Sequence, residues 1–236
     1  MENTKFGKAM CGRFSLTGDL DFYASYFGVD EVVAEPIPKN WNVAPTDPVY
    51  VILERDDKRL LTSMRWGLVP HWAKTRRSIH INARAETADR TPAFRDAFAR
   101  HRCLIPADGF YEWEPPEEGR TPHWVYRADG RPMAFAGLWS ARRDPKGDVW
   151  ERSCAILTTE ARGPIAPIHD RMPVALENSA WEMWLDRDLT DPEVVRSFLR
   201  TISEDIIMEH PVSKQVNSVR NNGPDLQLPA QPETLF

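Results

Sequence analysis

The stretch RCLIPADGFYEWE, residues 102–114, decides the fold because it places two strand-like runs close together. Arg102–Ile105 and Phe110–Glu114 are rich in the aliphatic and aromatic side chains that favour extended backbone. Five further runs of this kind occur at residues 49–54, 60–66, 123–127, 133–139 and 154–159. We therefore expect a protein dominated by short strands.

Helix signals are few and short. Residues 19–28 predict a helix that Thr17 or Asp19 caps and Gly28 ends. Further helices are expected to open at Thr91-Pro92 (through Arg100), at Asn178 (with Trp181, Trp184 and Leu185 on one side) and at Asp191-Pro192 (through Arg200). Residues 36–48 hold four prolines and predict a loop. Together with the strands, these signals favour a single α+β domain around a curved, mostly antiparallel sheet with short peripheral helices.

Composition limits the classes of function. The 236 residues carry a net charge of −5, which argues against a protein that coats polyanions generally. A local positive groove is still compatible with this charge, and Arg76-Arg77, Arg84 and Arg100-His101-Arg102 are candidates for it; the alternative is a solvated face.

The cysteines indicate a reducing compartment. Three cysteines at 11, 103 and 154 do not form a disulfide framework, so we expect a cytoplasmic protein. Cys103 and Cys154 lie in apolar runs and are expected to be small buried side chains. We also expect no membrane span and no secretory signal, because no apolar stretch is long enough.

Cys11 is the first candidate for chemistry, because it lies almost at the start of the chain in Met10-Cys11-Gly12-Arg13-Phe14. If the mature chain begins at Cys11, one residue carries an α-amine and a thiol. The amine can condense with an aldehyde to an imine, and the thiol can then close a thiazolidine ring. The alternative is an ordinary buried cysteine.

Polar residues in apolar surroundings are the next candidates. Alternation in residues 79–86 puts His80, Asn82, Arg84 and Glu86 on one face, which is either solvent-exposed or lines a cleft.

Glu112 lies between Tyr111 and Trp113, and partial desolvation there would raise its pKa towards the range useful for proton transfer. The alternative is a structural carboxylate paired with Arg84 or Arg102.

His169 lies in a loop bounded by prolines, where either catalysis or simple surface exposure is compatible with the sequence. Tryptophans 41, 66, 72 and 113 fall near these segments and could stack on unpaired bases or pack in the core. The six histidines show no metal-binding spacing, so we expect no metal and no cofactor.

Seven motifs occur in the order seen in one family. They are CGRF (11–14), NVAP (42–45), RWGLVP (65–70), INARAET (81–87), ADGFYEW (107–113), IHDRMP (168–173) and HPVS (210–213). The chain resembles the SOS response-associated peptidase (SRAP) family, also called abasic-site processing proteins, from Cys11 to about Asn222. The resemblance implies a curved mixed sheet with peripheral helices.

The resemblance also implies function. Family members bind single-stranded DNA and crosslink covalently to abasic sites, so Cys11, Asn82, Glu112 and His169 are the implied catalytic residues. The implied DNA-binding residues are Gly12, Arg13, Asn42, Pro45, Trp66, Trp72, Arg84 and His210. We expect a thiazolidine link that protects abasic sites in the SOS response to DNA damage, with lyase activity as a further candidate. The expected partner is single-stranded DNA containing abasic sites, bound by a monomer associated with the nucleoid.

The chemistry requires a free α-amine at Cys11, yet ten residues precede it. Either translation starts at Met10 and the methionine is removed, or residues 1–10 are a prosegment that the Cys11 thiol cleaves off. The expected organisation is this extension, an SRAP domain over residues 11–222 and a Pro-rich tail over residues 223–236. A cysteine peptidase acting on other proteins and a non-covalent single-strand binder are the alternative functions.

Overall fold

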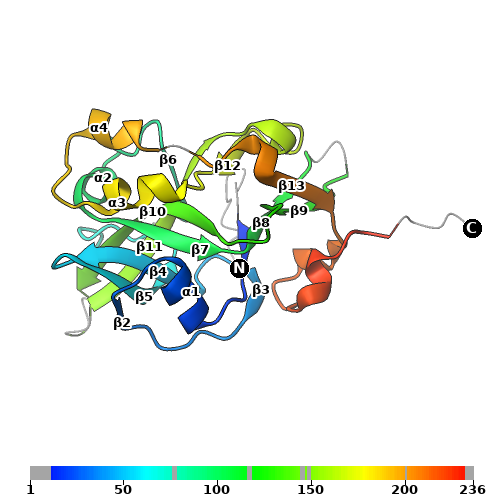
Figure 1. Cartoon of the computed structure of the whole chain (residues 1–236), viewed down its shortest axis with the longest axis horizontal. Helices are drawn as coiled ribbons and strands as arrows, with labels where there is room; N and C mark the ends of the chain where they lie inside the picture. The colour runs from blue at the N-terminus through cyan, green and yellow to red at the C-terminus, as the bar shows by residue number, and fades with distance from the viewer. Residues whose placement is uncertain are drawn as a thin grey trace, which may run out of the picture.

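Two β-sheets dominate the computed structural model, which describes residues 12–75, 79–115, 119–143, 147, 150–199 and 201–231 (Figure 1). The strands are β1 (Arg13–Leu16), β2 (Glu31–Val32), β3 (Asn40–Val43), β4 (Pro48–Arg55), β5 (Lys58–Trp66), β6 (Asn82–Arg84), β7 (Arg102–Ala107), β8 (Gly109–Trp113), β9 (Pro122–Arg127), β10 (Met133–Arg143), β11 (Trp150–Glu160), β12 (Arg171–Pro173) and β13 (Ile207–Pro211). The α-helices are α1 (Leu20–Tyr26), α2 (Arg95–Arg100), α3 (Trp181–Leu185) and α4 (Pro192–Ser197). The 3₁₀ turns are η2 (Gly163–Ile165), η3 (Asn178–Ala180), η4 (Glu204–Ile206), η5 (Lys214–Asn217) and η6 (Pro224–Gln227).

The larger sheet curls until it closes on itself. Its strand order is β12-β11-β10-β7-β4-β5-β2, and β11 pairs again with β5 through Ser153–Arg65 and Cys154–Trp66. The second edge of β11 is thus shared by β5 and β6, while β12 continues the edge that pairs with β10. This closure buries the apolar faces of the strands, and Cys103 and Cys154 are fully buried inside, as expected.

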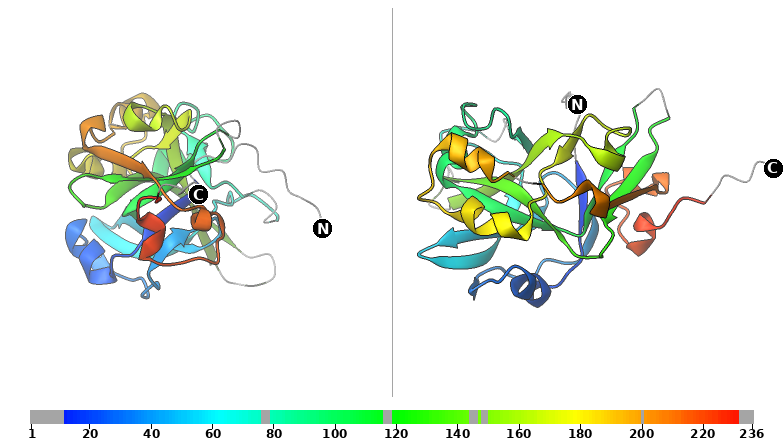
Figure 2. Two further views of the ribbon diagram at one scale, coloured as in Figure 1. Left: turned by 90° about the vertical axis from the view of Figure 1, so that its right-hand side faces the viewer. Right: turned by 45° about the horizontal axis from the view of Figure 1, so that its top comes forward.

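The smaller sheet, in the order β13-β9-β8-β1-β3, lies against one end of this barrel-like curl. Because side chains alternate along a strand, it has two different faces. Phe14 and Phe110 point into the main core, whereas Tyr111 and Trp124 form a second cluster on the opposite face. The C-terminal segment, orange to red in the left view of Figure 2, covers that second cluster.

The predicted α+β class, the single domain and the seven strand-like runs are confirmed. The short β1, β2, β3, β6, β12 and β13 were not predicted, and β3 forms inside the segment expected to be a loop. These strands have too few residues for a clear alternation, and pairing with long neighbours stabilises them. The tail expected after residue 222 also packs on the body, because Leu226 is buried and Ala230 donates a backbone hydrogen bond to Pro211.

The helices lie at the periphery and follow the expected signals at their starts. Asp19 caps α1 by accepting from the backbone N–H of Phe22, and Asp191 caps α4 in the same way. The helix expected from Pro92 begins only at Arg95, and α4 ends at Ser197 rather than at residue 200. All of these helices are short, and none of the described helices is long and apolar enough to cross a membrane.

Arg102 is a structural residue, contrary to its predicted place in a basic groove. Its side chain is buried, lies over the Trp184 ring and donates hydrogen bonds only to backbone carbonyls. These carbonyls belong to Phe98, Ala99, Trp184, Asp186 and Leu189. A guanidinium can satisfy five acceptors in this way, so Arg102 joins the ends of α2 and α3 and is not the partner of Glu112.

Trp66 connects three elements at the junction of the two sheets. Its ring is fully buried, lies 5.0 Å from that of Phe14 in β1, and donates from Nε1 to the carbonyl of Ile81, the residue before β6. The sequence placed Trp66 in a DNA groove, but a ring with 0% exposure cannot stack on a base. Its position instead fixes β1 relative to β6.

Replacing Trp66 with Phe should lower the free energy of unfolding by about 2–4 kcal/mol. The change leaves a void and removes the donor to the buried Ile81 carbonyl. Urea denaturation measures this loss. The matched control is Trp72→Phe at a ring that is 56% exposed, where we expect a change within about 0.5 kcal/mol. Equal stability of the two variants would contradict the structural role of Trp66.

Candidate functional site

The start of β1 is held by a buried polar clamp. Gly12 is the first described residue, so Cys11 lies outside the described residues. The guanidinium of Arg13 donates to Asn42 Oδ1 (2.8 Å), to the carbonyl of Val216 (2.9 Å) and to that of Asn217 (3.3 Å). Burial lowers the pKa of Arg13, and the nearby Asp47 partly opposes this effect. The Arg13 side chain therefore anchors the strand.

Asn42 in β3 is the centre of this clamp and is only 2% exposed. Its Nδ2 donates to the carbonyls of Val216, Ser218 and Asn221, while its Oδ1 accepts from Arg13. An amide carries both donors and an acceptor, so this residue type can satisfy both sides at once. Arg13 and Asn42 were predicted to contact DNA, but these observed bonds give both of them a positioning role.

Glu112 lies on β8, directly beside the start of β1. Register pairs Arg13 with Tyr111, so alternation puts Glu112 on the face of the sheet that carries Phe14 and Phe110. The side chain is 1% exposed, as expected from its aromatic neighbours. A carboxylate at the border of the core can exchange protons with a substrate while bulk water is kept away.

Asn82 is positioned by the second edge of β11. It is the first residue of β6 and pairs in parallel with Ile156, while the preceding Ile81 accepts the Trp66 hydrogen bond. Its side chain is half-buried. Arg84, two residues further along the same face, is exposed. Asn82 and Arg84 therefore lie on one face of β6, as the alternation predicts, but the Asn82 amide is half-buried whereas the Arg84 guanidinium is exposed.

His169 lies between η2 and β12, with its ring mostly buried. The backbone N–H of Arg171 donates to Nδ1 (3.0 Å), and Asp170 Oδ1 lies 3.0 Å from the same nitrogen. Because a backbone N–H can only donate, Nδ1 accepts in the neutral ring and Nε2 carries the hydrogen. When the ring is protonated, Nδ1 carries a hydrogen and can donate it to Asp170 Oδ1. His169 can therefore give or take a proton.

The loop that carries His169 is fixed at its far end by Arg171. This arginine binds Glu86 through two hydrogen bonds (2.7 and 2.8 Å) and donates to the carbonyl of Thr158 (2.7 Å). Burial raises the pKa of Glu86, but the bonds from Arg171 outweigh it, so the pKa is lowered overall. The segment after β6 and the first residue of β12 are thus joined.

Asn82, Glu112 and His169 come from three segments that are linked to one another. Glu112 lies on β8, which pairs with β1. Trp66 contacts Phe14 of β1 and binds Ile81, the residue before Asn82. Arg171, two residues after His169, binds Glu86 in the segment after β6. Figure 1 shows β1 in the middle of the molecule beside β8, with β12 above it.

The remaining predicted DNA-binding residues divide into two groups. Trp72 and Arg84 are exposed and Pro45 is half-buried, so their side chains can reach a ligand. His210 in β13 instead donates from Nε2 to the Gln227 carbonyl (2.8 Å), and its ring lies 5.5 Å from that of Tyr126. It therefore belongs to the face covered by the C-terminal segment, on the other side of the sheet from Glu112.

Comparison with known proteins gives the family. Residues 10–219 match the family model described as SOS response associated peptidase (SRAP). The chain belongs to the SRAP family. The sequence-based assignment to this family is confirmed, together with the fold that it implied.

Relatives of this SRAP chain share one kind of name. Abasic site processing protein YoqW of Bacillus subtilis (strain 168) is 37% identical over 221 residues, which are 92% of this chain and 98% of the relative. Abasic site processing protein YedK of Escherichia coli (strain K12) is 31% identical over 225 residues, covering 93% and 100% of the two chains. Abasic site processing protein HMCES of Gallus gallus is 29% identical, covering 81% and 66%.

Solved structures agree with the SRAP fold. A crystal structure from Bacteroides thetaiotaomicron matches with a TM-score of 0.81 at 22% identity, covering 94% of this chain and all of that one. A second, from Bordetella bronchiseptica, matches with a TM-score of 0.74 at 28% identity and covers 86% and 100%. The first likeness shows the fold alone.

Sequence reasoning missed His123, which faces Glu112 across the β8–β9 pair. Its Nδ1 lies 2.5 Å from Glu209 Oε2 and its Nε2 lies 3.2 Å from Glu114 Oε1. A side-chain hydrogen bond with Thr121 lowers the pKa of Glu114 most, burial opposes this effect, and His123 lowers the pKa further. Glu112, Glu114 and His123 alternate onto one face, a signal that the GFYEWE and PHWVY runs contain but that needs the strand pairing to interpret. Within the described residues, these groups do not form a cluster that could hold a metal ion.

His123→Ala should lower the free energy of unfolding by about 2–3 kcal/mol at neutral pH, because it leaves two carboxylates without their shared partner. The lowered pKa of Glu114 means that its contribution is present above about pH 4.3 and is lost as pH falls through the folded pKa. The difference between wild type and variant should therefore shrink in acid. Urea titrations at several pH values test this, with the exposed His71→Ala as control. A difference that does not change with pH would contradict the assignment.

Proposed function

We propose that this chain binds single-stranded DNA at abasic sites and captures the sugar as a thiazolidine through the α-amine and thiol of Cys11. The observations that support the proposal are the pairing of β8, which carries Glu112, with the strand that begins two residues after Cys11, and the link from that strand through Trp66 to the residue before Asn82. The names of the SRAP relatives, which say that they process abasic sites, support the same substrate.

The proposed reaction needs no cofactor. The Cys11 nitrogen attacks C1′ of the ring-opened sugar, and a proton moves from nitrogen to the carbonyl oxygen, giving a carbinolamine. This oxygen leaves as water, so an imine forms. Sγ then adds to the imine carbon while the thiol proton moves to nitrogen. One C–N and one C–S bond form, and one water is released.

Asn82, Glu112 and His169 each have a role that the chemistry of the side chain allows. Glu112 and His169 titrate, so they can carry protons to and from the sugar oxygen and the amine. Asn82 does not titrate, and it orients the nucleophile or the aldehyde oxygen by hydrogen bonds. Trp72 can stack on a base beside the baseless sugar, and Arg84 can contact a phosphate. Selectivity then arises from the aldehyde and the backbone.

The thiol of Cys11 can also free the α-amine of Cys11 from its peptide bond. Sγ of Cys11 attacks the carbonyl of Met10, so that the acyl group moves from nitrogen to sulfur and the amine is freed. Water then cleaves the thioester and releases residues 1–10. This self-processing accounts for the word peptidase in the family description and needs no pocket for a foreign peptide.

The decisive experiment compares protein that begins at Cys11 with the same protein carrying Cys11→Ala. Each is incubated with a single-stranded oligonucleotide containing one abasic site and with the intact oligonucleotide. We expect an adduct that survives denaturing gel electrophoresis only for the Cys11 protein with the abasic strand. Intact mass should show an increase equal to the oligonucleotide less one water.

Two outcomes would contradict the proposal. One is that protein beginning at Cys11 gives no adduct. The other is that protein shown by mass spectrometry to keep residues 1–10 still gives the denaturant-stable adduct, since its nitrogen is then part of a peptide bond.

Glu112→Gln should slow adduct formation by about 10²–10⁴-fold, because the amide cannot transfer protons. Single-turnover time courses across a range of pH measure the rate, and the variant should also lose one limb of the pH profile. Glu31→Gln, at an exposed position in the edge strand β2, is the matched control and should react like wild type. An unchanged rate and profile for Glu112→Gln would rule out its role as proton carrier.

A further inference from the structure

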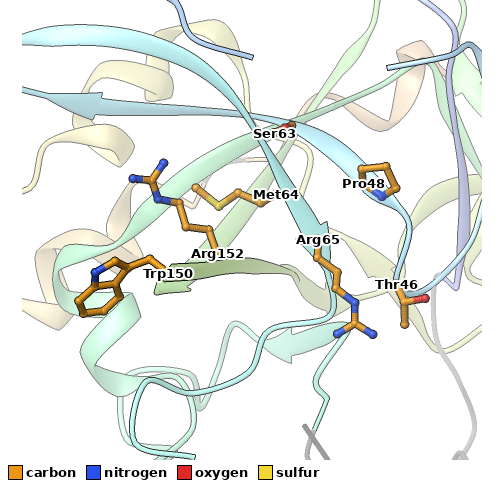
Figure 3. Close-up of a pocket in the computed structure, with 7 residues that line it drawn as sticks. All are labelled: Thr46, Pro48, Ser63, Met64, Arg65, Trp150 and Arg152. Carbon is orange, nitrogen blue, oxygen red and sulfur yellow. The ribbon is translucent and has the colours of Figure 1, made fainter. Parts of the chain in front are cut away.

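A pocket of about 540 Å³ lies among the segment after Pro45, the end of β5 and the start of β11, and none of its lining residues has a role in the proposed chemistry. Its lining residues are Thr46, Pro48, Ser63, Met64, Arg65, Trp150 and Arg152. Figure 3 shows Trp150 and Arg152 on one side and Thr46, Pro48 and Arg65 on the other, with Met64 between them.

The charged side chains that line the pocket are all positive. It contains two arginines and no acidic residue among the described residues that line it. The nearest acid in sequence, Glu151, points to the opposite face of β11, where it binds the buried Arg142 (2.6 Å). Asp47 accepts instead from the backbone N–H of Ala44 (3.0 Å). The pocket is therefore positively charged on a chain of net negative charge.

Trp150 supplies a flat apolar surface at the pocket mouth. Its side chain is 62% exposed, although burial of a tryptophan is strongly favoured in a folded protein. Arg143 lies opposite Trp150 across the β10–β11 pair, and Arg152 follows two residues later on the same face. An exposed aromatic ring among arginines is suited to a stacked base with its phosphates.

The pocket is continuous with the candidate site through the backbone. The N–H of Thr46 donates to the Trp66 carbonyl (2.7 Å), so the segment after Pro45 lies against the end of β5. Trp66 in turn holds Ile81, beside Asn82. On the face of the β10–β11 hairpin that lies opposite to Trp150 and Arg152, Arg142 donates to the carbonyl of Ala73, next to Trp72. The β10–β11 hairpin thus stands between Trp72 and the pocket.

We propose that this pocket binds a nucleotide of the single strand that flanks the abasic site, with the base stacked on Trp150 and the phosphates near Arg65 and Arg152. This inference rests on the proposed function and adds a second contact region beyond the reacting sugar. Two separated contact regions would hold the strand on both sides of the flexible baseless position, and they would favour long single strands over short ones.

The test measures binding of labelled oligonucleotides by fluorescence anisotropy. The central residue is a tetrahydrofuran analogue of the baseless sugar, which has no aldehyde and cannot be captured. One oligonucleotide is short, and two others are extended with thymidines on the 5′ side only or on the 3′ side only. Wild type should gain about fivefold to tenfold in affinity from one of the two extensions.

The variants are Trp150→Ala and Arg152→Gln. Both should lose the gain from extension, and Arg152→Gln should also reduce the salt dependence of binding by about one phosphate contact. The matched controls are Arg55→Gln, an exposed arginine at the other end of the β4–β5 hairpin, and Phe22→Ala, an exposed aromatic ring on α1. Thermal unfolding confirms that each variant is folded.

The outcomes separate this inference from the proposed function. If wild type captures abasic strands but extension brings no gain on either side, or if both variants keep the gain, the pocket is not a nucleotide site. If wild type neither binds the analogue nor captures the abasic strand, the proposed function fails and this inference fails with it. Loss of the gain in the variants alone, with both controls unchanged, supports the pocket.

Discussion

The pairing along both edges of β11 is the constraint on which the rest of the structure depends. One edge of β11 pairs with β10 and then, from Thr158 to Glu160, with β12. The other edge pairs first with β5 and then with β6, so that it closes the barrel and positions Asn82. Thr158 pairs with β6 on one edge and with β12 on the other, and it thereby joins the strand that carries Asn82 to the strand that follows the His169 loop.

The smaller sheet is attached to the larger one by a different kind of interaction. Its β1 is held on one face by apolar contact between Phe14 and Trp66, and on the other by the hydrogen bonds of Arg13 and Asn42. Buried polar groups are costly unless they are satisfied, and here nearly every bond goes to a backbone carbonyl of residues 216–221. These two sets of contacts therefore fix both the position and the register of β1.

Sequence analysis predicted the class of fold and the long strands, because these leave local signals, whereas the assignment of the site residues stays a prediction. Glu112 between two aromatic residues is an example of such a signal, since its burial follows from its neighbours. The roles of Trp66, Arg102 and His210 could not be predicted, because an aromatic or cationic side chain has the same local pattern whether it is buried or exposed. Only the pairing of β5 with β11, the ends of α2 and α3, and the position of Gln227 decide these cases.

His123 and Trp150 are residues that sequence analysis could not select as candidates. Each became a candidate only when register placed His123 opposite Glu112 and Trp150 opposite Arg143. Residue pairs far apart in the chain are invisible to periodicity, which reports one element at a time. The three-dimensional pairing therefore adds to the functional surface.

The clamp around Asn42 also has a consequence for synthesis. Its acceptors lie in residues 216–221, near the end of the chain, whereas the strand that it anchors emerges from the ribosome first. A growing polypeptide thus cannot fix β1 in place until residues 216–221 have been made. Products that stop before these residues lack this anchor, so the order of synthesis itself sets when the strand is fixed.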